Sequence, residues 1–369
     1  MTTLPLSQAA SNNRIPTLDG WRALAILMVT VGHVAPRISN VSRQVLRFTE
    51  YGPMGVDIFF GLSGLLITKL LLEERDLTGR ISLQAFYTRR CFRVVLPYYL
   101  FVAVLWICSA IKPGLELLSC LLFFRNYIAE DFAGPYSTHL WSLAIEEHFY
   151  LLWPPLLILA SPKYGRQVAI WSSIACGLWR IANLEYFPHV AGEAFRHYRT
   201  DLRIDSLLWG CVLAFVLHEE RSFETLKEKL TPTVWISLLA LFLVCVVFYS
   251  PLTRLWIPML VPMLIAGTLT HPHWVISRLF DCEPVRWIGR LSYSLYLWQN
   301  VFLIDQQHYW WRKFPINLVL MVLLIIFIHN FVEKPLVRIG RRLSDRSKAR
   351  RRRKAGEDHQ ALVMELKSS

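Results

Sequence analysis

Residues 22–33 read Arg-Ala-Leu-Ala-Ile-Leu-Met-Val-Thr-Val-Gly-His, a charge-free run enclosed by two ionisable side chains. An ionisable side chain inside an apolar helix is costly, so Arg22 and His33 are candidates for a functional site. On a helix they would lie about 16 Å apart along the axis, near half the thickness of a bilayer core. An arginine that reaches the headgroups and a histidine satisfied by a neighbouring helix would explain the same pattern structurally. The stretch predicts a first membrane helix and leaves both interpretations open.

The composition indicates a membrane protein with many crossings. Of the 369 residues, 54% are hydrophobic and only 18% are charged, and the abundant Trp, Tyr and Phe suit membrane interfaces. The formal net charge is +13, and a strongly basic stretch lies in the tail at Arg350–Lys354. A basic tail directly after a membrane helix is typical of a cytoplasmic anchor on anionic lipid. We therefore expect contact with membrane lipid and no nucleic-acid binding.

The pattern of apolar runs predicts an all-α fold, a polytopic transmembrane helix bundle of about ten spanning helices. Several runs are shorter than the usual twenty residues, so their boundaries are loose. The runs cover residues 18–35, 54–72, 92–111, 141–160, 167–182, 204–217, 234–249, 255–269, 287–304 and 316–332. The segment 115–124 is too short to cross alone and is expected to be re-entrant or interfacial.

Charge in the loops predicts the orientation. The basic connections are 75–93, 163–166, 221–229 and 278–290, followed by the tail. They all fall on one side if the N-terminus is cytoplasmic and ten helices cross, which places both termini in the cytoplasm. The opposite side carries a weaker basic set: Arg37, Arg43, Arg47, Arg125, Arg196, Arg199, Arg254, Arg312 and Lys313. We expect a disordered cytoplasmic N-terminus at 1–14, a membrane domain at 15–340 and a basic cytoplasmic tail at 341–369.

Cysteine usage and the first residues exclude two further classes. The seven cysteines form no CxxC pair and lie mostly in apolar stretches, so we expect neither a disulfide framework nor a metal site. Residues 1–19 are polar and have no apolar core ahead of a cleavage site, so we expect no cleaved signal peptide.

A cluster of arginines opens the third run, in the sequence Arg89-Arg90-Cys91-Phe92-Arg93. Arg90 and Arg93 are three residues apart, so on a helix they share one face. Planar, permanently charged guanidinium groups suit phosphate, and a helix N-terminus adds a positive field. Ordinary basic-side topology would produce the same cluster. With Arg22 on the same membrane face, the cluster could instead hold the phosphates of a cytoplasmic donor.

Carboxylates near the outer helix ends are the candidate partners of His33. Glu146 and Glu147 stand side by side at the start of the fourth run and are costly there unless paired or wetted. Asp57 begins the second run, where the helix dipole also favours an acid. We expect one of these three to orient or charge-balance His33. Ser63 follows a glycine in GLSG, but the context is not that of a nucleophile, and we expect small residues there for close helix approach.

Two further segments could bind an acceptor. Asp201, Arg203 and Asp205 precede another outer helix start, where they could pair with one another or bind a sugar. Tyr296 and Trp298 belong to the aromatic segment SYSLYLW, where packing and the lining of a carbohydrate path are alternatives.

Seven segments, in this order, resemble the acyltransferase-3 family of integral membrane O-acyltransferases over about residues 15–340. They read LDGWRALAILMVTVGH, GVDIFFGLSGLLIT, FYTRRCFRVVLPYY, HLWSLAIEEHFYLLWP, RTDLRIDSLLWG, LSYSLYLW and VEKPL. The resemblance implies acyl transfer from cytoplasmic acyl-CoA, acetyl-CoA above all, to a hydroxyl of an exported or surface carbohydrate at a bacterial cytoplasmic (inner) membrane. It also implies that Arg22, His33, Arg90 and Arg93 are functional.

Two positions depart from the family pattern. Family members often have Gln where this chain has His148, and His where it has Gln299. A histidine at the second position that assists acceptor binding would be missing here, so the acceptor or its geometry would differ. We also expect no appended esterase-like domain, so a relay through one would need another protein.

The sequence predicts a membrane O-acyltransferase in which His33 is the general base. Acyl-CoA would bind to four arginines, Arg22, Arg89, Arg90 and Arg93. Neutral His33 would take the proton of the attacking hydroxyl, which the usual histidine pKa of about 6.5 permits. Direct transfer and a covalent acyl-His33 route both remain open. The rival classes are a transporter or flippase of lipid-linked sugars, for which no paired halves are evident, and a non-catalytic membrane scaffold. The oligomeric state is not predicted.

Overall fold

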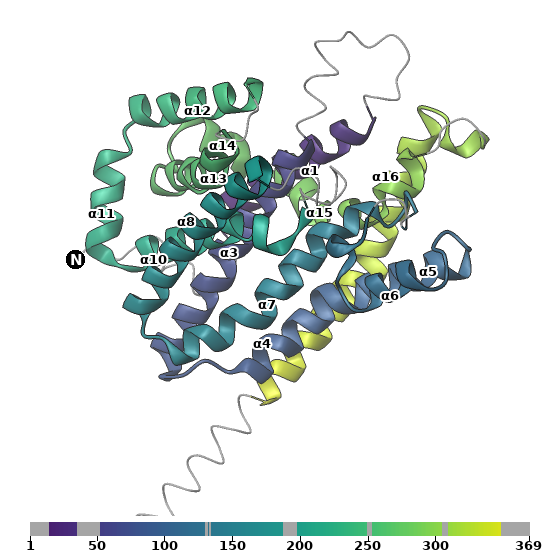
Figure 1. The fold of residues 1–369 in the computed structure, drawn as a ribbon, viewed down its shortest axis with the longest axis horizontal. Coiled ribbons are helices and arrows are strands. Elements are labelled where there is room, and N and C mark those ends of the chain that lie inside the picture. The colour runs from purple at the N-terminus through teal and green to yellow at the C-terminus, as the bar shows by residue number, and fades with distance from the viewer. Residues whose placement is uncertain are drawn as a thin grey trace, which may run out of the picture.

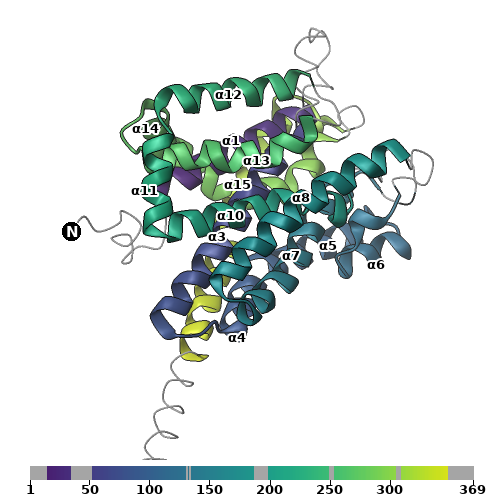
Figure 2. The same ribbon diagram turned by 60° about the vertical axis from the view of Figure 1, so that its left-hand side comes forward.

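The described part of the chain is a bundle of α-helices (Figures 1 and 2). The structure is a computed structural model that describes residues 15–34, 52–129, 132, 134–186, 198–248, 253–304 and 309–347. No strand occurs in these ranges, so the all-α prediction is confirmed for them. Two terminal segments lie outside the described residues, 1–14 and 348–369. So do four arginines of the weaker basic set: Arg37, Arg43, Arg47 and Arg196.

The long helices follow the predicted apolar runs. In the first half of the chain the helices are α1 (Pro16–Val34), α3 (Gly52–Thr78), α4 (Leu83–Arg90), the π-helix η3 (Cys91–Val95), α5 (Leu96–Ile107), α6 (Leu115–Leu121), the short 3₁₀ turns η4 (Arg125–Tyr127) and η6 (Thr138–Leu140), and α7 (Trp141–Leu159). The second half contains α8 (Pro162–Tyr186), the 3₁₀ turn η7 (Thr200–Leu202), α10 (Asp205–His218), α11 (Glu220–Lys229), α12 (Pro232–Val247), α13 (Thr253–Thr270), α14 (Val275–Asp281), α15 (Glu283–Leu303), η8 (Trp310–Arg312), α16 (Ile316–Ile328) and the π-helix η9 (His329–Glu333).

Fewer than the ten expected helices of the described part are both long enough and apolar enough to cross a membrane. Three helices of the described part are long and apolar enough to cross alone: Met54–Thr78, Leu83–Ile107 and Ile316–Ser347. The count rises to five if the bent pairs α11–α12 and α13–α14, at 81° and 88°, each form one span. Ten spans are therefore not confirmed, because the other helices are shorter or more polar. For example, α10 has only 14 residues, and α15 opens with a charged turn.

Close backbone contacts set the helix packing. A Cβ added at Gly64 of α3 would lie 1.8 Å from the Leu207 carbonyl oxygen of α10, and one at Gly210 would lie 2.2 Å from the Gly61 oxygen. The expectation of small residues for close helix approach is confirmed at these positions. Gly289 of α15 meets the Asp19 backbone of α1 in the same way, with 1.8 Å to its carbonyl oxygen.

Two of the predicted basic connections, 75–93 and 163–166, lie with the end of the last helix at the lower end of the bundle in Figure 1, whereas α11 and α14 lie higher in that view. Arg89 of α4 donates to Ser344 at 2.7 Å, and Arg75 of α3 donates to the Leu157 and Ala160 carbonyls that end α7. On the same side, Arg166 pairs with Glu219 at 2.9 Å, joining α8 to the end of α10. The last helix runs on to Ser347, past the expected domain boundary at residue 340.

The segment 115–124 forms the short helix α6, too short to cross. Two tyrosines of α5 hold it: Tyr98 donates to the Cys120 carbonyl and Tyr99 to the Leu121 carbonyl, both at 2.8 Å. The buried Glu116 carboxylate accepts from the backbone N–H groups of Lys112 and Gly134 and thereby closes the loop over the bundle.

We predict that Gly64→Ala weakens the contact between α3 and α10. The new methyl group meets backbone atoms, which cannot rotate away, so the free energy of unfolding should fall by about 1–3 kcal/mol. Gly61→Ala is the matched control on the same helix, because its nearest contact is a Val261 side-chain carbon at 3.3 Å. Thermal unfolding in detergent measures both variants, and equal midpoints would contradict the packing assigned to Gly64.

Candidate active site

A stripe of polar side chains runs along one face of α7. Ser142, Glu146 and Tyr150 follow at intervals of four residues, so they point the same way over about 12 Å of helix. The Tyr150 hydroxyl donates to Glu146 Oε2 at 2.8 Å and has only one proton, so Ser63 of α3 donates to it across 2.6 Å. Ser63 therefore anchors the stripe to α3.

Three predicted arginines surround this stripe. The Arg90 guanidinium lies over the Tyr150 ring, with Cζ 4.5 Å from the ring centroid. Arg90, Arg22 and Arg93 all lie within electrostatic range of the Glu146 carboxylate. Arg90 ends α4, and Arg93 lies in the π-helix that follows. The structure thus brings guanidinium groups from α1 and from the α4–η3 junction to one carboxylate of α7.

Arg89 has a different environment from its neighbours. Its guanidinium donates to Ser344 and reaches Glu74 Oε2 at 3.5 Å, so it ties α4 to α3 and to the last helix. Its predicted role in donor binding stays a prediction.

Glu147 follows Glu146 in α7, so its side chain points about 100° away from the stripe. It lies within electrostatic range of Arg90 and Glu146. Its Oε1 is buried and has no hydrogen-bond partner in the part of the chain that the structure describes.

The Ser142 end of the stripe leads to a second histidine. Ser142 contacts the hydroxyl of Tyr296, which donates to the His139 carbonyl at 2.8 Å. Asn300 Nδ2 donates to His139 Nδ1 at 2.7 Å, so Nε2 carries the proton and donates to the Leu297 carbonyl at 3.1 Å. Both ring nitrogens of His139 are engaged, and His139 lies within electrostatic range of His33.

Sequence reasoning missed His139. Its only signal was its place at the head of the segment HLWSLAIEEHFYLLWP, ahead of a tryptophan, which reads equally well as an interfacial residue. Its ring partners lie on α15, about 160 residues away, and are not visible in a local pattern.

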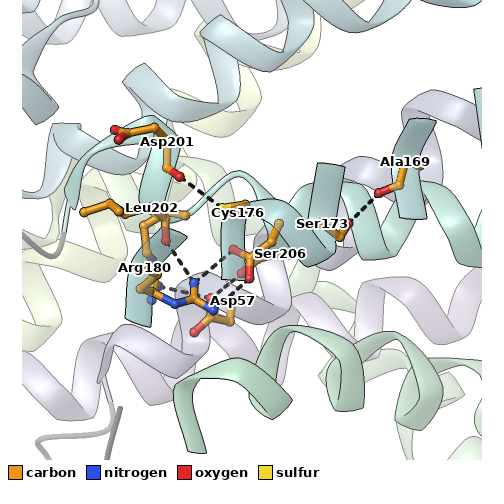
Figure 3. Close-up of polar contacts among 10 residues, drawn as sticks. Asp57, Ala169, Ser173, Cys176, Arg180, Asp201, Leu202 and Ser206 are labelled. Atoms are coloured by element: carbon orange, nitrogen blue, oxygen red, sulfur yellow. Dashed lines mark hydrogen bonds and ion pairs between the residues drawn. The ribbon is translucent and has the colours of Figure 1, made fainter. Parts of the chain in front are cut away.

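Asp57 belongs to another network, at the start of α10 (Figure 3). Asp57 Oδ1 accepts from Arg203 at 3.0 Å and from Ser206 at 2.8 Å. The Arg180 guanidinium of α8 binds both carboxylate oxygens of Asp205, at 3.0 and 2.8 Å. All four charged side chains of these contacts are buried, and the pairs join α3, α8 and the start of α10.

The residues expected to bind an acceptor are engaged within the fold. Asp201 accepts from Arg199 at 3.0 and 2.6 Å and from the Trp179 indole at 2.8 Å. Arg203 and Asp205 are paired as described, which gives all three a structural partner. Trp298 packs its ring on Phe101, with centroids 5.0 Å apart. Their acceptor roles stay predictions.

Two remaining expectations concern His148 and metals. His148 Nδ1 lies 2.7 Å from the Thr200 hydroxyl, on a face of α7 away from Glu146. In the described ranges no three His, Cys, Asp or Glu side chains gather as a metal site would require.

Residues 15–329 match the family model described as an acyltransferase domain, which covers most of the chain and includes six of the seven segments quoted above, all but VEKPL. The chain belongs to this family. The predicted resemblance to the acyltransferase-3 family is confirmed, and with it a multi-pass membrane protein. No solved structure matches the chain.

Curated relatives resemble most of this chain. The peptidoglycan O-acetyltransferase OatA of Listeria monocytogenes is 30% identical, over 89% of this chain and 57% of its own length. The O-acetyltransferase OatA of Staphylococcus aureus is 27% identical, over 91% and 59%, and the putative peptidoglycan O-acetyltransferase YrhL of Bacillus subtilis is 30% identical, over 87% and 55%. The chain thus spans somewhat more than half the length of these relatives.

We predict that Arg180→Met strongly destabilises the bundle, because it leaves the buried Asp205 carboxylate without its counter-charge. The expected loss is about 3–5 kcal/mol, seen as a lower thermal midpoint in detergent. The double variant Arg180→Met/Asp205→Leu should recover much of it. Arg166→Met, at the exposed pair with Glu219, is the control and should cost no more than about 1 kcal/mol. A double variant as unstable as Arg180→Met would refute the charge-pair explanation.

Proposed function

We propose that this protein is a membrane O-acetyltransferase that moves an acetyl group from cytoplasmic acetyl-CoA to a hydroxyl of a peptidoglycan-type carbohydrate. Family membership and the names of the relatives support the reaction class. The observation that carries the proposal is the polar stripe of α7, which has arginines at one end and a pair of histidines at the other. The protein is then a bacterial inner-membrane enzyme with both termini, and its basic tail, in the cytoplasm.

The arginines form the end of the site that binds the acetyl donor, acetyl-CoA. Arg22, Arg90 and Arg93 present permanent charges within electrostatic range of Glu146, and Arg90 follows Arg89, which binds Ser344 of the last helix. Guanidinium groups bind phosphate through paired hydrogen bonds, so the phosphates of acetyl-CoA are the expected occupants. Glu146 holds part of this positive charge when the donor is absent.

The remainder of the donor extends along the stripe. Ser63, Tyr150 and Ser142 supply hydroxyl groups between the arginines and the histidines. The axial distance from Arg22 to His33 is about 16 Å, which an extended pantetheine arm can bridge. The thioester then lies near His33, which accepts the proton of the attacking carbohydrate hydroxyl.

We predict that His33→Ala lowers kcat by about 10²- to 10⁴-fold, since a positioned general base contributes that much. The assay uses purified protein in nanodiscs with acetyl-CoA and soluble peptidoglycan fragments, and follows thiol release and acetylated product by mass spectrometry. His273→Ala, at an exposed loop histidine, should keep wild-type activity.

Three outcomes discriminate the classes. Wild-type turnover retained in His33→Ala refutes the base assignment. Absence of turnover in the wild type, with movement of lipid-linked sugar across the membrane of reconstituted sealed vesicles, identifies a transporter. Binding of acetyl-CoA without thiol release identifies a scaffold.

We predict that Arg90→Gln raises KM for acetyl-CoA about tenfold or more with little change in kcat, because a charged hydrogen bond contributes about 1.5–3 kcal/mol. Acetyl-pantetheine, which lacks the nucleotide phosphates, should be used equally well by both enzymes. Arg278→Gln, at an exposed arginine outside the site, is the control for a general effect of positive charge. Equal losses for the two donors would show that Arg90 does not bind phosphate.

A further inference from the structure

Gln299 carries an unsatisfied amide in the interior of the bundle. The side chain is fully buried, at 0% exposure, on the inner face of α15. Thr30 of α1 donates to its Oε1 at 3.2 Å, which fixes the direction of the amide plane. Its Nε2 has no hydrogen-bond partner among the residues that the structure describes.

The residue that holds this amide lies one helical turn from His33 on α1. Thr30 and His33 are three residues apart on α1, so they share one face of the helix and lie one turn from each other. The next residue of α15, Asn300, binds His139, which in turn lies within electrostatic range of His33. Gln299 and the two histidines therefore border the same region between α1, η6 and α15.

An unpaired buried donor has a cost that the fold does not recover. Leaving such a group unsatisfied destabilises a protein by about 1–3 kcal/mol, and native structures rarely contain one without a role. A Met or Leu of similar size would fill the position without that cost. Its oxygen accepts a hydrogen bond from Thr30, and the described residues provide no acceptor for its nitrogen. The Nε2 group is therefore arranged to donate to an acceptor outside these residues.

We propose that Gln299 Nε2 donates a hydrogen bond to the acyl carbonyl oxygen during transfer, and is a catalytic residue that stabilises the oxyanion. The inference rests on the proposed acetyl transfer at His33. The neighbouring orphan atom, Asn300 Oδ1, is an acceptor and cannot serve an oxyanion.

The reaction step is then balanced as follows. The acceptor hydroxyl oxygen attacks the thioester carbonyl carbon, a C–O bond forms, and the hydroxyl proton passes to His33. The carbonyl electron pair moves to oxygen, where Gln299 donates to the negative charge. When the carbonyl re-forms, the C–S bond breaks and the leaving thiolate takes the proton from His33, giving the acetyl ester and coenzyme A thiol.

The kinetic test compares Gln299→Met and Gln299→Glu with wild type. Both keep the size of the side chain and remove the N–H donors, so kcat should fall about 10²- to 10³-fold, as for the loss of other oxyanion donors. KM for acetyl-CoA should change little, since the donor acts in the transition state. Gln299→His keeps a ring N–H and should retain more activity than either.

A spectroscopic test separates this inference from the general-base proposal. In the His33→Ala background, carbonyl-labelled acetyl-CoA bound to the protein should show a thioester stretch at lower frequency than in Gln299→Met, because a hydrogen bond weakens the C=O bond. Asn317→Leu, at a buried amide of α16 whose N–H and oxygen are both bonded, is the matched control. It should lower thermal stability and leave both the stretch and kcat unchanged.

The outcomes are distinct. An unchanged kcat and an unchanged stretch in Gln299→Met overturn the role of Gln299 while the acetyl transfer stands. Losses in Gln299→Met that match those of Asn317→Leu assign Gln299 to packing and also overturn it. A wild-type protein that binds acetyl-CoA without turning it over refutes the proposed function, and the stretch then reports independently whether Gln299 contacts the carbonyl.

Discussion

The constraint on which this bundle depends is the cost of charge inside an apolar interior. Every ionised group placed there needs a partner, since an isolated charge costs several kcal/mol even after relaxation. The structure meets this requirement in two ways. Asp57 with Arg203, and Arg180 with Asp205, form closed pairs between helices. Glu146 instead lies within electrostatic range of Arg22, Arg90 and Arg93 together, and Arg22 also pairs with Asp19 at 3.4 Å.

The first network joins helices, whereas the polar stripe of α7 is the candidate site for the reaction. In the network of Asp57 and Asp205, both carboxylate oxygens of Asp205 accept hydrogen bonds from the Arg180 guanidinium, so little remains to recognise a ligand. Along the α7 stripe hydroxyl groups are linked in series, and the buried Glu147 Oε1 has no partner among the described residues. On α15, Gln299 Nε2 and Asn300 Oδ1 also have no partner among them. Polar groups that are held in place yet incompletely satisfied are what a substrate path requires.

Sequence patterns could predict the helices, the small residues of GLSG and the grouping of arginines, because each depends on local spacing or on which membrane side a loop faces. Partner choice depends on which helix faces meet, and spacing alone does not determine it. Ser63 reaches Tyr150 across 87 positions, and Asp57 reaches Arg203 across 146. For the same reason spacing offers Asp57 as one of three candidate partners of His33, although it contacts Arg203 and Ser206, and gives no signal for His139. Ten crossings are not confirmed, because helices such as α10 are apolar but short.

The register of α1 connects the fold to the chemistry. Gly289 of α15 presses against the Asp19 backbone, and Gly55 of α3 against the Ala25 carbonyl, so α1 can neither slide nor rotate without a backbone clash. That register sets Arg22 near Glu146 and sets Thr30 on Gln299 at the same time. Because the helix is rigid from Arg22 to Thr30, the two ends of the site are held at a fixed separation. A shift of one residue along α1 would move both ends by about 1.5 Å and turn them by about 100°, which would separate the arginine from its carboxylate and the histidine from the amide together.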